Sequence, residues 1–452
     1  MSQIRVRGSL YPFRGVRYNS KLPIIRPGRL IAPPGEASTP EREALLRTRP
    51  FHSIHLFPPR LPTRAGDEIE DTERERLRNI LAQWHDADAL RQDAMPGFYL
   101  HSQEFTAPDG SRAVRHGLIG SLRLSDHGPL EILPHEETLS HRLNRQVALL
   151  EAVGVQALPI FLLYSDPEGV VSTTLETLVK RHQEESESFT DDTGQRHSLH
   201  HIDAASTIES IQSLIGSRSL LIADGHHRFD SLRRLWREYG HRLVPAIQEK
   251  ISPGEALLSV YLTHIEDPGL FVGAIHRLLH TIHTSYDDAL DGLRPYYHRH
   301  KRAFSAPRWD EVEALLRESD EGTLVLLHHD RPHFDILIPG DKSPSEGLSP
   351  LPETLADLDV TRLHRLILPR LRGEGPELGI DYAKDGRQAL ESVRRGEHSL
   401  GIFLKPTPAA AVWEAARRGL TLPPKATWFF PKIPAGLVSM PFKSLGSPTA
   451  AG

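Results

Sequence analysis

The sequence of 452 residues contains no cysteine. This absence excludes a disulfide framework, a thiol nucleophile, an iron–sulfur cluster and any zinc site built on thiolates. The chain also lacks the run of roughly 20 apolar residues that a membrane helix requires. Its first residues, MSQIRVRGSL, include no apolar segment of the kind found in secretory signals. We therefore expect a cytoplasmic protein without a membrane partner.

Several ligand-binding motifs are missing as well. The phosphate-binding pattern GxxxxGK(S/T) is absent, which excludes a P-loop kinase, and so is the GxGxxG pattern of a Rossmann dinucleotide site. Without HExxH or another histidine pair at ligand spacing, the motifs predict no dedicated zinc site. Lys and Arg number 54 against 59 Asp and Glu, and this net charge of −5 argues against a nucleic-acid partner.

What the chain does contain is typical of a folded, multidomain protein. Apolar residues make up 38% and charged residues 25%, and the length predicts two or three domains. Predicted strands and helices alternate without a regular βαβ rhythm, which favours an α+β class with mixed sheets and flanking helices. We expect an N-terminal lobe over 1–250 and a C-terminal lobe over 251–452. The sequence does not indicate an oligomeric state.

Local patterns predict most of the elements. Apolar spacing predicts helices over 68–92, 140–153, 205–215, 269–282, 360–371 and 408–418, and another directly after residue 225. Strands are expected within 97–132, around a hairpin at Asp109-Gly110, and at 158–169, 219–223, 256–262, 323–338 and 400–404. The polar stretch 181–201 is predicted to be a surface loop. Most of the 26 histidines are interpreted as having no specific role.

The most informative motif is Asp224-Gly225-His226-His227-Arg228, which lies where a buried strand ends and an amphipathic helix begins. Such a junction offers free backbone N–H groups and the positive end of the helix dipole to an anion. Gly225 permits close approach of a ligand, and Arg228 suits phosphate oxygens. Asp224 suits a base or magnesium ligand, and the histidines suit phosphate contacts or proton transfer. The alternative is a simple helix cap.

Three further segments carry candidate residues, each with a structural alternative. Glu136 lies in His135-Glu136-Glu137-Thr138, whose spacing alone favours helix capping. Lys405 and Thr407 follow a buried strand at a helix start, which suits either phosphate or a cap. Lys425 and Lys432 flank the aromatic residues 428–430, which suits either a nucleotide pocket or an aromatic clasp with solvated lysines.

The order of motifs resembles the DUF1015 family, over about residues 12–438. The segments that carry the resemblance are PFRGVRY (12–18), LIAPP (30–34), GFYLHSQEF (97–105), HEET (135–138), PIFLLYSDP (159–167), LIADGHHRFDSL (221–232), EDPGL (266–270), LDVTRLHRLIL (358–368), IDYAKDGRQAL (380–390), FLKPTP (403–408) and PPKATWFFPKIPAGLV (423–438). The DGHHR step is similar to the phosphate-binding turn of the ParB/sulfiredoxin-like fold, on which free-serine kinases occur.

The resemblance implies a phosphotransferase that uses ATP or ADP with Mg²⁺ and acts on a small hydroxylated metabolite such as free L-serine. Asp224, His226, His227 and Arg228 would form the phosphate and catalytic turn, with Glu136 as the second acidic group. Asp224 and Glu136 would be the candidate Mg²⁺ ligands. Lys405, Lys425 and Lys432 would neutralise phosphate charge. The alternatives are a nucleotide-binding regulator without turnover and a ParB-like nuclease or DNA-binding protein.

The sequence departs from the family pattern at several polar positions. Gly35-Glu36 replaces a Tyr-Asp pair, Glu137 replaces a basic residue, Asn144 replaces an aspartate that is often present, and Ala426 replaces a serine. These changes imply a substrate other than serine, or weak activity.

Overall fold

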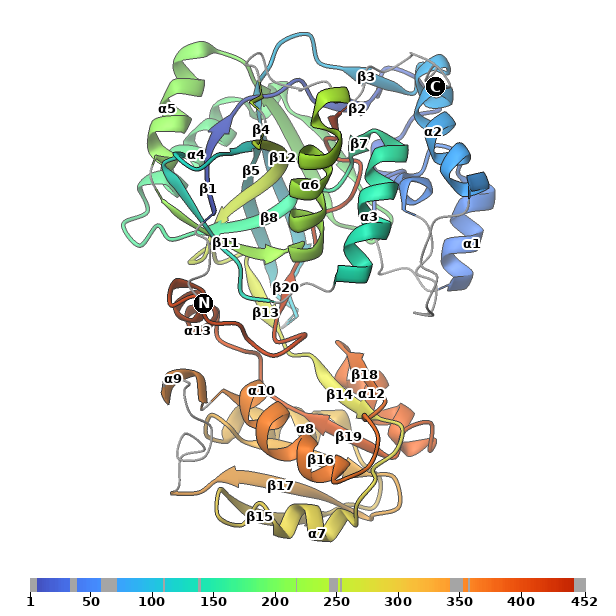
Figure 1. Cartoon of the computed structure of the whole chain (residues 1–452), viewed down its shortest axis with the longest axis vertical. Coiled ribbons are helices and arrows are strands. Elements are labelled where there is room, and N and C mark those ends of the chain that lie inside the picture. The colour runs from blue at the N-terminus through green and yellow to red at the C-terminus, as the bar shows by residue number, and fades with distance from the viewer. Residues whose placement is uncertain are drawn as a thin grey trace. The chain divides into compact units, whose positions relative to one another are not determined.

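The computed structural model describes residues 6–32, 39–57, 71–108, 110–136, 140–216, 218–243, 251–252, 254–341, 353–356 and 358–442 (Figure 1). The chain divides into two compact units. Unit 1 comprises Met1–Phe271 and Pro431–Gly452, and unit 2 comprises Val272–Phe430. The chain passes into unit 2 within strand β13 (Phe271–Gly273) and returns to unit 1 directly after β20 (Trp428–Phe430). Unit 1 is therefore built from two separated stretches of sequence.

A closed barrel forms the centre of unit 1. Its six strands, in spatial order, are β1 (Val6–Tyr11), β6 (Leu130–Leu133), β11 (Ser219–Asp224), β8 (Ile160–Tyr164), β12 (Ala256–His264) and β5 (Arg112–Leu124). The barrel closes because β1 pairs with both β6 and β5. The β11–β6 and β12–β8 pairs are parallel and the other pairs are antiparallel, so the barrel is mixed. Beyond β5 the sheet continues through β4 (Phe98–Thr106), β10 (Arg196–Ile202) and β9 (Glu187–Thr190).

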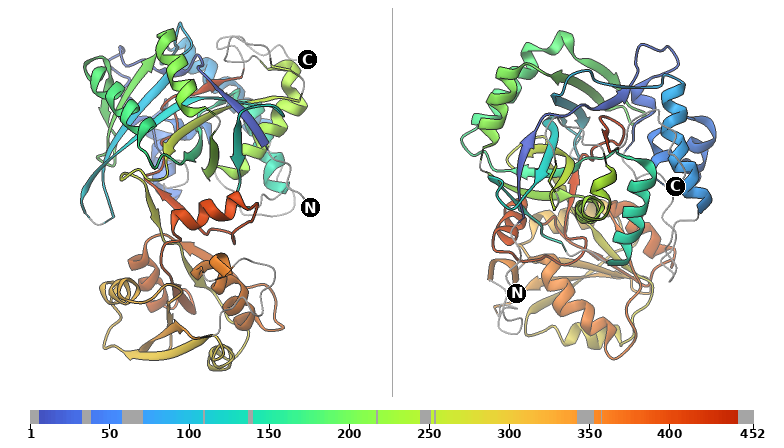
Figure 2. Two further views of the ribbon diagram at one scale, coloured as in Figure 1. Left: turned by 90° about the vertical axis from the view of Figure 1, so that its left-hand side faces the viewer. Right: turned by 45° about the horizontal axis from the view of Figure 1, so that its top comes forward.

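Helices cover the strands of unit 1. They are α1 (Thr39–Thr48), α2 (Asp71–Asp86), α3 (Ser140–Val153), α4 (Val170–Arg181), α5 (Ala205–Ile215) and α6 (His226–Tyr239). Helix α6 contacts β12 and β8, and α3 lies beside α6, as Figure 2 shows. Phe229, Leu232, Leu235 and Trp236 are buried on one side of α6, and the Trp236 indole donates a 2.7 Å hydrogen bond to the Leu257 carbonyl. This apolar side fixes how the helix lies on the barrel.

Short elements complete unit 1. They are the strand pairs β2 (Val16–Tyr18) with β3 (Leu90–Gln92) and β7 (Val155–Gln156) with β21 (Met440–Pro441), and 3₁₀ turns at Pro27–Arg29, Ser53–Leu56, Gln183–Glu185 and Gly240–Arg242. No helix in the described part of the chain has the length and apolarity needed to cross a membrane.

Unit 2 contains a six-stranded antiparallel sheet. Its spatial order is β15 (Tyr297–Ala303), β17 (His333–Pro339), β16 (Leu324–His328), β19 (Leu400–Phe403), β14 (His276–Leu279) and β18 (Ile380–Ala383). Helices α8 (Trp309–Glu318) and α12 (Gly386–Arg394) contribute to an apolar core with β16 and β19. The remaining helices are α7 (Tyr286–Asp291), α9 (Glu353–Ala356), α10 (Asp359–Arg362), a π-helical turn at Leu363–Ile367, α11 (Leu368–Arg372) and α13 (Ala409–Arg417).

The structure confirms the α+β class and most predicted elements. Helices α3 and α5 have the predicted bounds, and β4 and β5 form the predicted hairpin. Gly110 adopts φ +85° in its turn, as an Asp-Gly hairpin requires, although Asp109 lies outside the described residues. The two units have other bounds than the lobes expected at 1–250 and 251–452, because the last described residues belong to unit 1.

Two predictions of secondary structure were wrong. The stretch 181–201, predicted to be a loop, contains the antiparallel strands β9 and β10. The buried residues of β10 are His197, Leu199 and Ile202. Of these, His197 and Leu199 share one face, and the histidine hid the two-residue alternation there. The segment 269–282, predicted to be helical, forms β13 and β14. Arg277 on β14 is fully buried, so a charged residue interrupts the apolar pattern of this strand.

A buried arginine connects the barrel to the returning C-terminal segment. Arg115 on β5 is 0% exposed. Its guanidinium donates 2.6 Å and 2.8 Å hydrogen bonds to the carbonyl of Pro431 and to Gln103 Oε1. The same group lies over the rings of Phe161 and Tyr261, at 5.0 Å and 5.3 Å from their centroids. Arg115 therefore holds residue 431 against three strands of the barrel.

We expect Arg115→Met to destabilise unit 1 by about 2–4 kcal/mol, because two buried acceptors lose a charged donor. The free energy of unfolding in urea measures this loss. Arg123→Met is the matched control on the same strand. In its pair with Glu255 the two side chains remain 21% and 16% exposed, so we expect a smaller loss, of about 1 kcal/mol. Equal losses in the two variants would contradict a central role for Arg115.

Candidate functional site

The turn between β11 and α6 has an unusual backbone. Gly225 connects Asp224 to His226 with φ +104°, a left-handed conformation that favours glycine. A Cβ atom at this position would lie 2.9 Å from Arg228 Nη2, so the turn also needs the space. Gly225 is the N-cap residue and makes no side-chain cap. Asp224 therefore does not have the capping role that was the alternative interpretation of this motif.

Asp224 is held between two cations. Its Oδ2 atom accepts a 3.0 Å hydrogen bond from Arg228 Nη2, and its Oδ1 atom lies 3.3 Å from Lys432 Nζ. Burial raises the pKa of this carboxyl, but the charges of Lys432 and Arg228 outweigh that effect and lower the pKa from its usual 3.8 to about 2. The Asp224 side chain is still 41% exposed. The result is a carboxylate that is ionised at neutral pH and partly exposed to solvent.

Arg228 forms its hydrogen bonds with groups of the protein itself. Its Nη1 atom donates hydrogen bonds of 3.0 Å and 2.9 Å to the carbonyls of Leu158 and Pro159, just before β8. Burial lowers the pKa of Arg228, and the neighbouring Asp224 opposes this shift. The guanidinium thus ties α6 to the start of β8 and orients Asp224. This geometry gives Arg228 a positioning role that the sequence did not predict.

His135 and Glu136 lie beside the first turn of α6. His226 is buried, and its Nε2 atom accepts a 3.2 Å hydrogen bond from the backbone N–H of His135. The remaining ring proton is therefore on Nδ1, which lies 3.9 Å from Glu136 Oε2. The His135 ring meets His226 edge to face, and burial lowers the pKa of His135 to about 4. Glu136 is 23% exposed.

Lys432 reaches the turn because its segment is anchored on both sides of the residue. Arg115 binds the carbonyl of Pro431, and Gln103 Nε2 donates a 3.4 Å hydrogen bond to the carbonyl of Lys432. Neither Arg115 nor Gln103 was recognised in the sequence. The available signal was a charged residue at an inward position of a long strand.

The other predicted site residues are placed differently. His227 follows His226 in the first turn of α6, and its carbonyl accepts a hydrogen bond from Ser231. Lys405, Thr407 and Lys425 belong to unit 2. There, Lys405 donates to the Ser319 carbonyl, and Thr407 donates a 2.9 Å hydrogen bond to the carbonyl of Ala426.

The departures from the family pattern are only partly visible. Gly35, Glu36 and Glu137 lie outside the described residues. Asn144 is described, and its side-chain oxygen accepts a hydrogen bond from Arg234. This bond connects α3 to α6.

A magnesium ion at this site would need oxygen atoms from a bound substrate in addition to the protein carboxylates. Asp224 and Glu136 belong to none of the groups of three or more metal-binding side chains among the described residues. Mg²⁺ in phosphoryl-transfer sites is usually held by one or two carboxylates together with substrate phosphates. The Asp224 carboxylate, 41% exposed, is a candidate for that role, although Arg228 at 3.0 Å and Lys432 at 3.3 Å already contact it.

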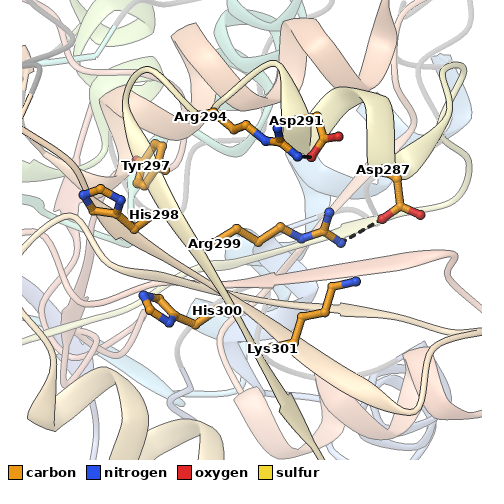
Figure 3. Close-up of a pocket in the computed structure, with 8 residues that line it drawn as sticks. All are labelled: Asp287, Asp291, Arg294, Tyr297, His298, Arg299, His300 and Lys301. Carbon is orange, nitrogen blue, oxygen red and sulfur yellow. Dashed lines mark hydrogen bonds and ion pairs between the residues drawn. The ribbon is translucent and has the colours of Figure 1, made fainter.

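A polar hollow of unit 2 is a separate candidate. It is lined by Asp287, Asp291, Arg294, Tyr297, His298, Arg299, His300 and Lys301 (Figure 3). Its charges are largely paired within the hollow: Arg299 contacts Asp287 at 2.9 Å, and Arg294 contacts Asp291 at 3.0 Å. None of the sequence-predicted site residues lines it.

The chain belongs to the DUF1015 family, described as "Protein of unknown function", with residues 10–361 matched. This confirms the resemblance as far as residue 361, and the segments at 380–390, 403–408 and 423–438 lie beyond the matched range. No curated protein matches the chain at a significant level.

Solved structures show distant likeness. A conserved hypothetical protein from Pyrococcus furiosus aligns with a TM-score of 0.34 and 14% identity, over 69% of this chain and 91% of that chain. A free serine kinase in complex with AMP gives 0.36 and 13%, over 69% and 88%. SbnI from Staphylococcus aureus, with a C-terminal truncation, gives 0.33 and 12%, over 66% and 78%.

We expect Lys432→Met to raise the pKa of Asp224 from about 2 toward its usual 3.8, because one of the two neighbouring cations is removed. The stabilisation that the ionised carboxylate provides is present above pH 3.8 and is lost as the pH falls toward 2. Carboxyl ¹³C NMR of aspartate-labelled protein measures the titration, with Asp224→Asn to assign the resonance. Lys180→Met, at the exposed end of α4, is the control. An unchanged midpoint in Lys432→Met would show that Lys432 does not act on Asp224.

Proposed function

We propose that this protein is a phosphotransferase that uses ATP or ADP with Mg²⁺ and acts on a small hydroxylated metabolite, of which free L-serine is the leading candidate. The observation that carries the proposal is the Asp224 carboxylate, ionised by two cations yet exposed, at the start of α6 and next to the Glu136–His226 pair. The resemblance of the DGHHR turn to the phosphate-binding turn of free-serine kinases supports the same choice. The assignment of the barrel to the ParB/sulfiredoxin-like fold remains part of this proposal.

The low pKa of Asp224 assigns it the role of a charged ligand. A general base works best when its pKa is near the working pH, and a group with a pKa of about 2 binds a proton weakly. Asp224 therefore suits a cation or a substrate ammonium group. Bound Mg²⁺ would neutralise phosphate charge at this carboxylate.

Glu136 is the better candidate for the base. The Nδ1–H group of His226 faces its carboxylate from the buried side and orients it, while 23% of the Glu136 side chain remains exposed. In the proposed step the substrate hydroxyl oxygen attacks the terminal phosphorus of the nucleotide, and the bond to the bridging oxygen breaks. The hydroxyl proton passes to Glu136. The products are the phosphorylated metabolite and ADP, or AMP when ADP is the donor.

The phosphate groups would lie against the start of α6. Gly225 has no side chain, so a ligand can approach its backbone closely. For the same reason Gly225 does not cap the first N–H groups of α6, which suit a phosphate group. Lys432, 18% exposed, would exchange part of its contact with Asp224 for a phosphate oxygen. His227 and Arg228 would support the same groups. Phosphate contacts from Lys405, Thr407 and Lys425 remain a prediction.

The direct test uses the purified full chain with Mg²⁺, ATP or ADP, and a panel of hydroxy amino acids, followed by ³¹P NMR. We expect a new phosphomonoester signal with at least one acceptor. Glu136→Gln should lower kcat/KM by roughly 10²-fold or more, because proton transfer of this kind contributes about 10²–10⁴-fold. Asp224→Asn should cause a loss of similar size.

Asp230→Asn is the matched control. It lies on α6, pairs with Arg233 at 3.5 Å on the outer side, and should leave the rate unchanged. The thermal midpoint of each variant separates a lost group from a lost fold. The proposal fails if no acceptor is phosphorylated by either nucleotide at high enzyme concentration. It also fails if Glu136→Gln and Asp224→Asn retain full activity.

A further inference from the structure

Two histidines and an aspartate converge at one end of three neighbouring strands in unit 2. His280 follows β14, Asp381 lies on β18, and His398 precedes β19. The Nε2 atoms of both imidazoles lie 3.1 Å from the same carboxylate oxygen, Asp381 Oδ2. The three atoms all lie within 4.8 Å of one another. The motifs predicted no zinc site, because ligands so far apart in sequence leave no local pattern.

The strand register determines this convergence. Leu279 lies opposite Ile380 on β18 and opposite Leu400 on β19. Just beyond these pairs, the N–H of His280 donates to the Gly379 carbonyl at 3.1 Å, and the N–H of Ser399 donates to the Leu279 carbonyl at 2.8 Å. The backbones that carry the three side chains are thus fixed by the sheet itself.

The hydrogen bonds around His398 determine its tautomer. Ser392 Oγ donates its single proton to the Glu397 carboxylate at 2.9 Å, since a carboxylate can only accept. At 2.6 Å from His398 Nδ1, Ser392 Oγ must therefore accept, so Nδ1 carries the proton. In neutral His398 the Nε2 lone pair then points at Asp381 Oδ2, 3.1 Å away. A lone pair of His398 Nε2 then faces a lone pair of Asp381 Oδ2. The two repel each other unless a cation lies between them.

Metal-binding histidines usually have a hydrogen bond like the one between His398 and Ser392. Such residues donate the second ring N–H to an oxygen, which fixes the ring and strengthens the ligand. Zinc binds imidazole nitrogen and carboxylate oxygen at about 2.0–2.2 Å, so ligands of a tetrahedral ion lie roughly 3.3 Å apart. The 3.1 Å separations at Asp381 are close to that value. His280 is 51% exposed, which leaves solvent access for a fourth ligand.

We propose that His280, Asp381 and His398 form a binding site for a divalent transition-metal ion, best matched by Zn²⁺, with water as the fourth ligand. The ion would connect the edge strand β18 to β14 and to the start of β19. It would therefore stabilise unit 2, and this role is independent of the proposed phosphotransferase activity.

Two other groups of side chains are weaker candidates. In His182, Glu185 and His200, no hydrogen bond among the described residues fixes the second nitrogen of either histidine, whereas Ser392 fixes that of His398. In His328, His329 and Asp330, the Nδ1 lone pair of His328 already accepts a hydrogen bond from the Asp330 N–H.

The test uses the untagged full chain, stripped of metal with a chelator, and titrated with Zn²⁺ by calorimetry. We expect one tight site whose affinity falls at least 100-fold in Asp381→Asn and in His280→Gln. Both side chains are more than half exposed, so these variants should fold. Ser392→Ala keeps all three ligands and should weaken binding by about 10–100-fold. The double variant His182→Gln/His200→Gln is the matched control and should bind as the wild type does.

Two further measurements make the test specific. Co²⁺ in place of Zn²⁺ should give the intense visible absorption of a tetrahedral site, and Asp381→Asn should abolish it. Zn²⁺ should raise the thermal midpoint of the wild type but not of Asp381→Asn. The proposal is overturned if the wild type binds no Zn²⁺, or if Asp381→Asn and His280→Gln leave the affinity unchanged.

Discussion

The buried guanidinium of Arg115 is the contact on which the organisation of unit 1 depends. Its partners are a carbonyl, a side-chain amide and the faces of two aromatic rings. Through them it joins β5 and β4 to a segment that returns after all of unit 2. The β21–β7 pair and the bridges Val16–Ser439 and Ala32–Ala435 continue this connection. The barrel and the C-terminal segment are thus one cooperative body.

The charge balance at the candidate site depends on the return of the C-terminal segment to the barrel. Asp224 ends a barrel strand, and one of its two cations, Arg228, comes from the same motif and is largely bound to carbonyls. The other, Lys432, comes from the returning segment and remains partly exposed. Arg228 therefore sets the position of the carboxylate, whereas Lys432 remains partly open to solvent. This difference gives the turn a fixed geometry with one adjustable charge.

The sequence predicted the periodic elements well and the buried polar ones poorly. Helices α3, α5 and α6 follow from apolar spacing, whereas β10 and β14 were missed because His197 and Arg277 occupy inward positions. Seven histidines, at 52, 101, 135, 197, 226, 276 and 398, are buried among the described residues, although the sequence assigned most histidines no specific role. Local sequence also could not separate Lys432 from Lys425, because only the fold assigns them to different units.

The discontinuous construction of unit 1 has a consequence for synthesis on the ribosome. All of unit 2 emerges before residues 431–442, so the barrel strands are synthesised well before the segment that closes on them. Until then Asp224 lacks the Lys432 ammonium, and Arg115 lacks the carbonyl of Pro431. A nascent or prematurely terminated chain would therefore carry the motif without its final charge. The charge balance of the turn is thus complete only after residue 432 has been synthesised.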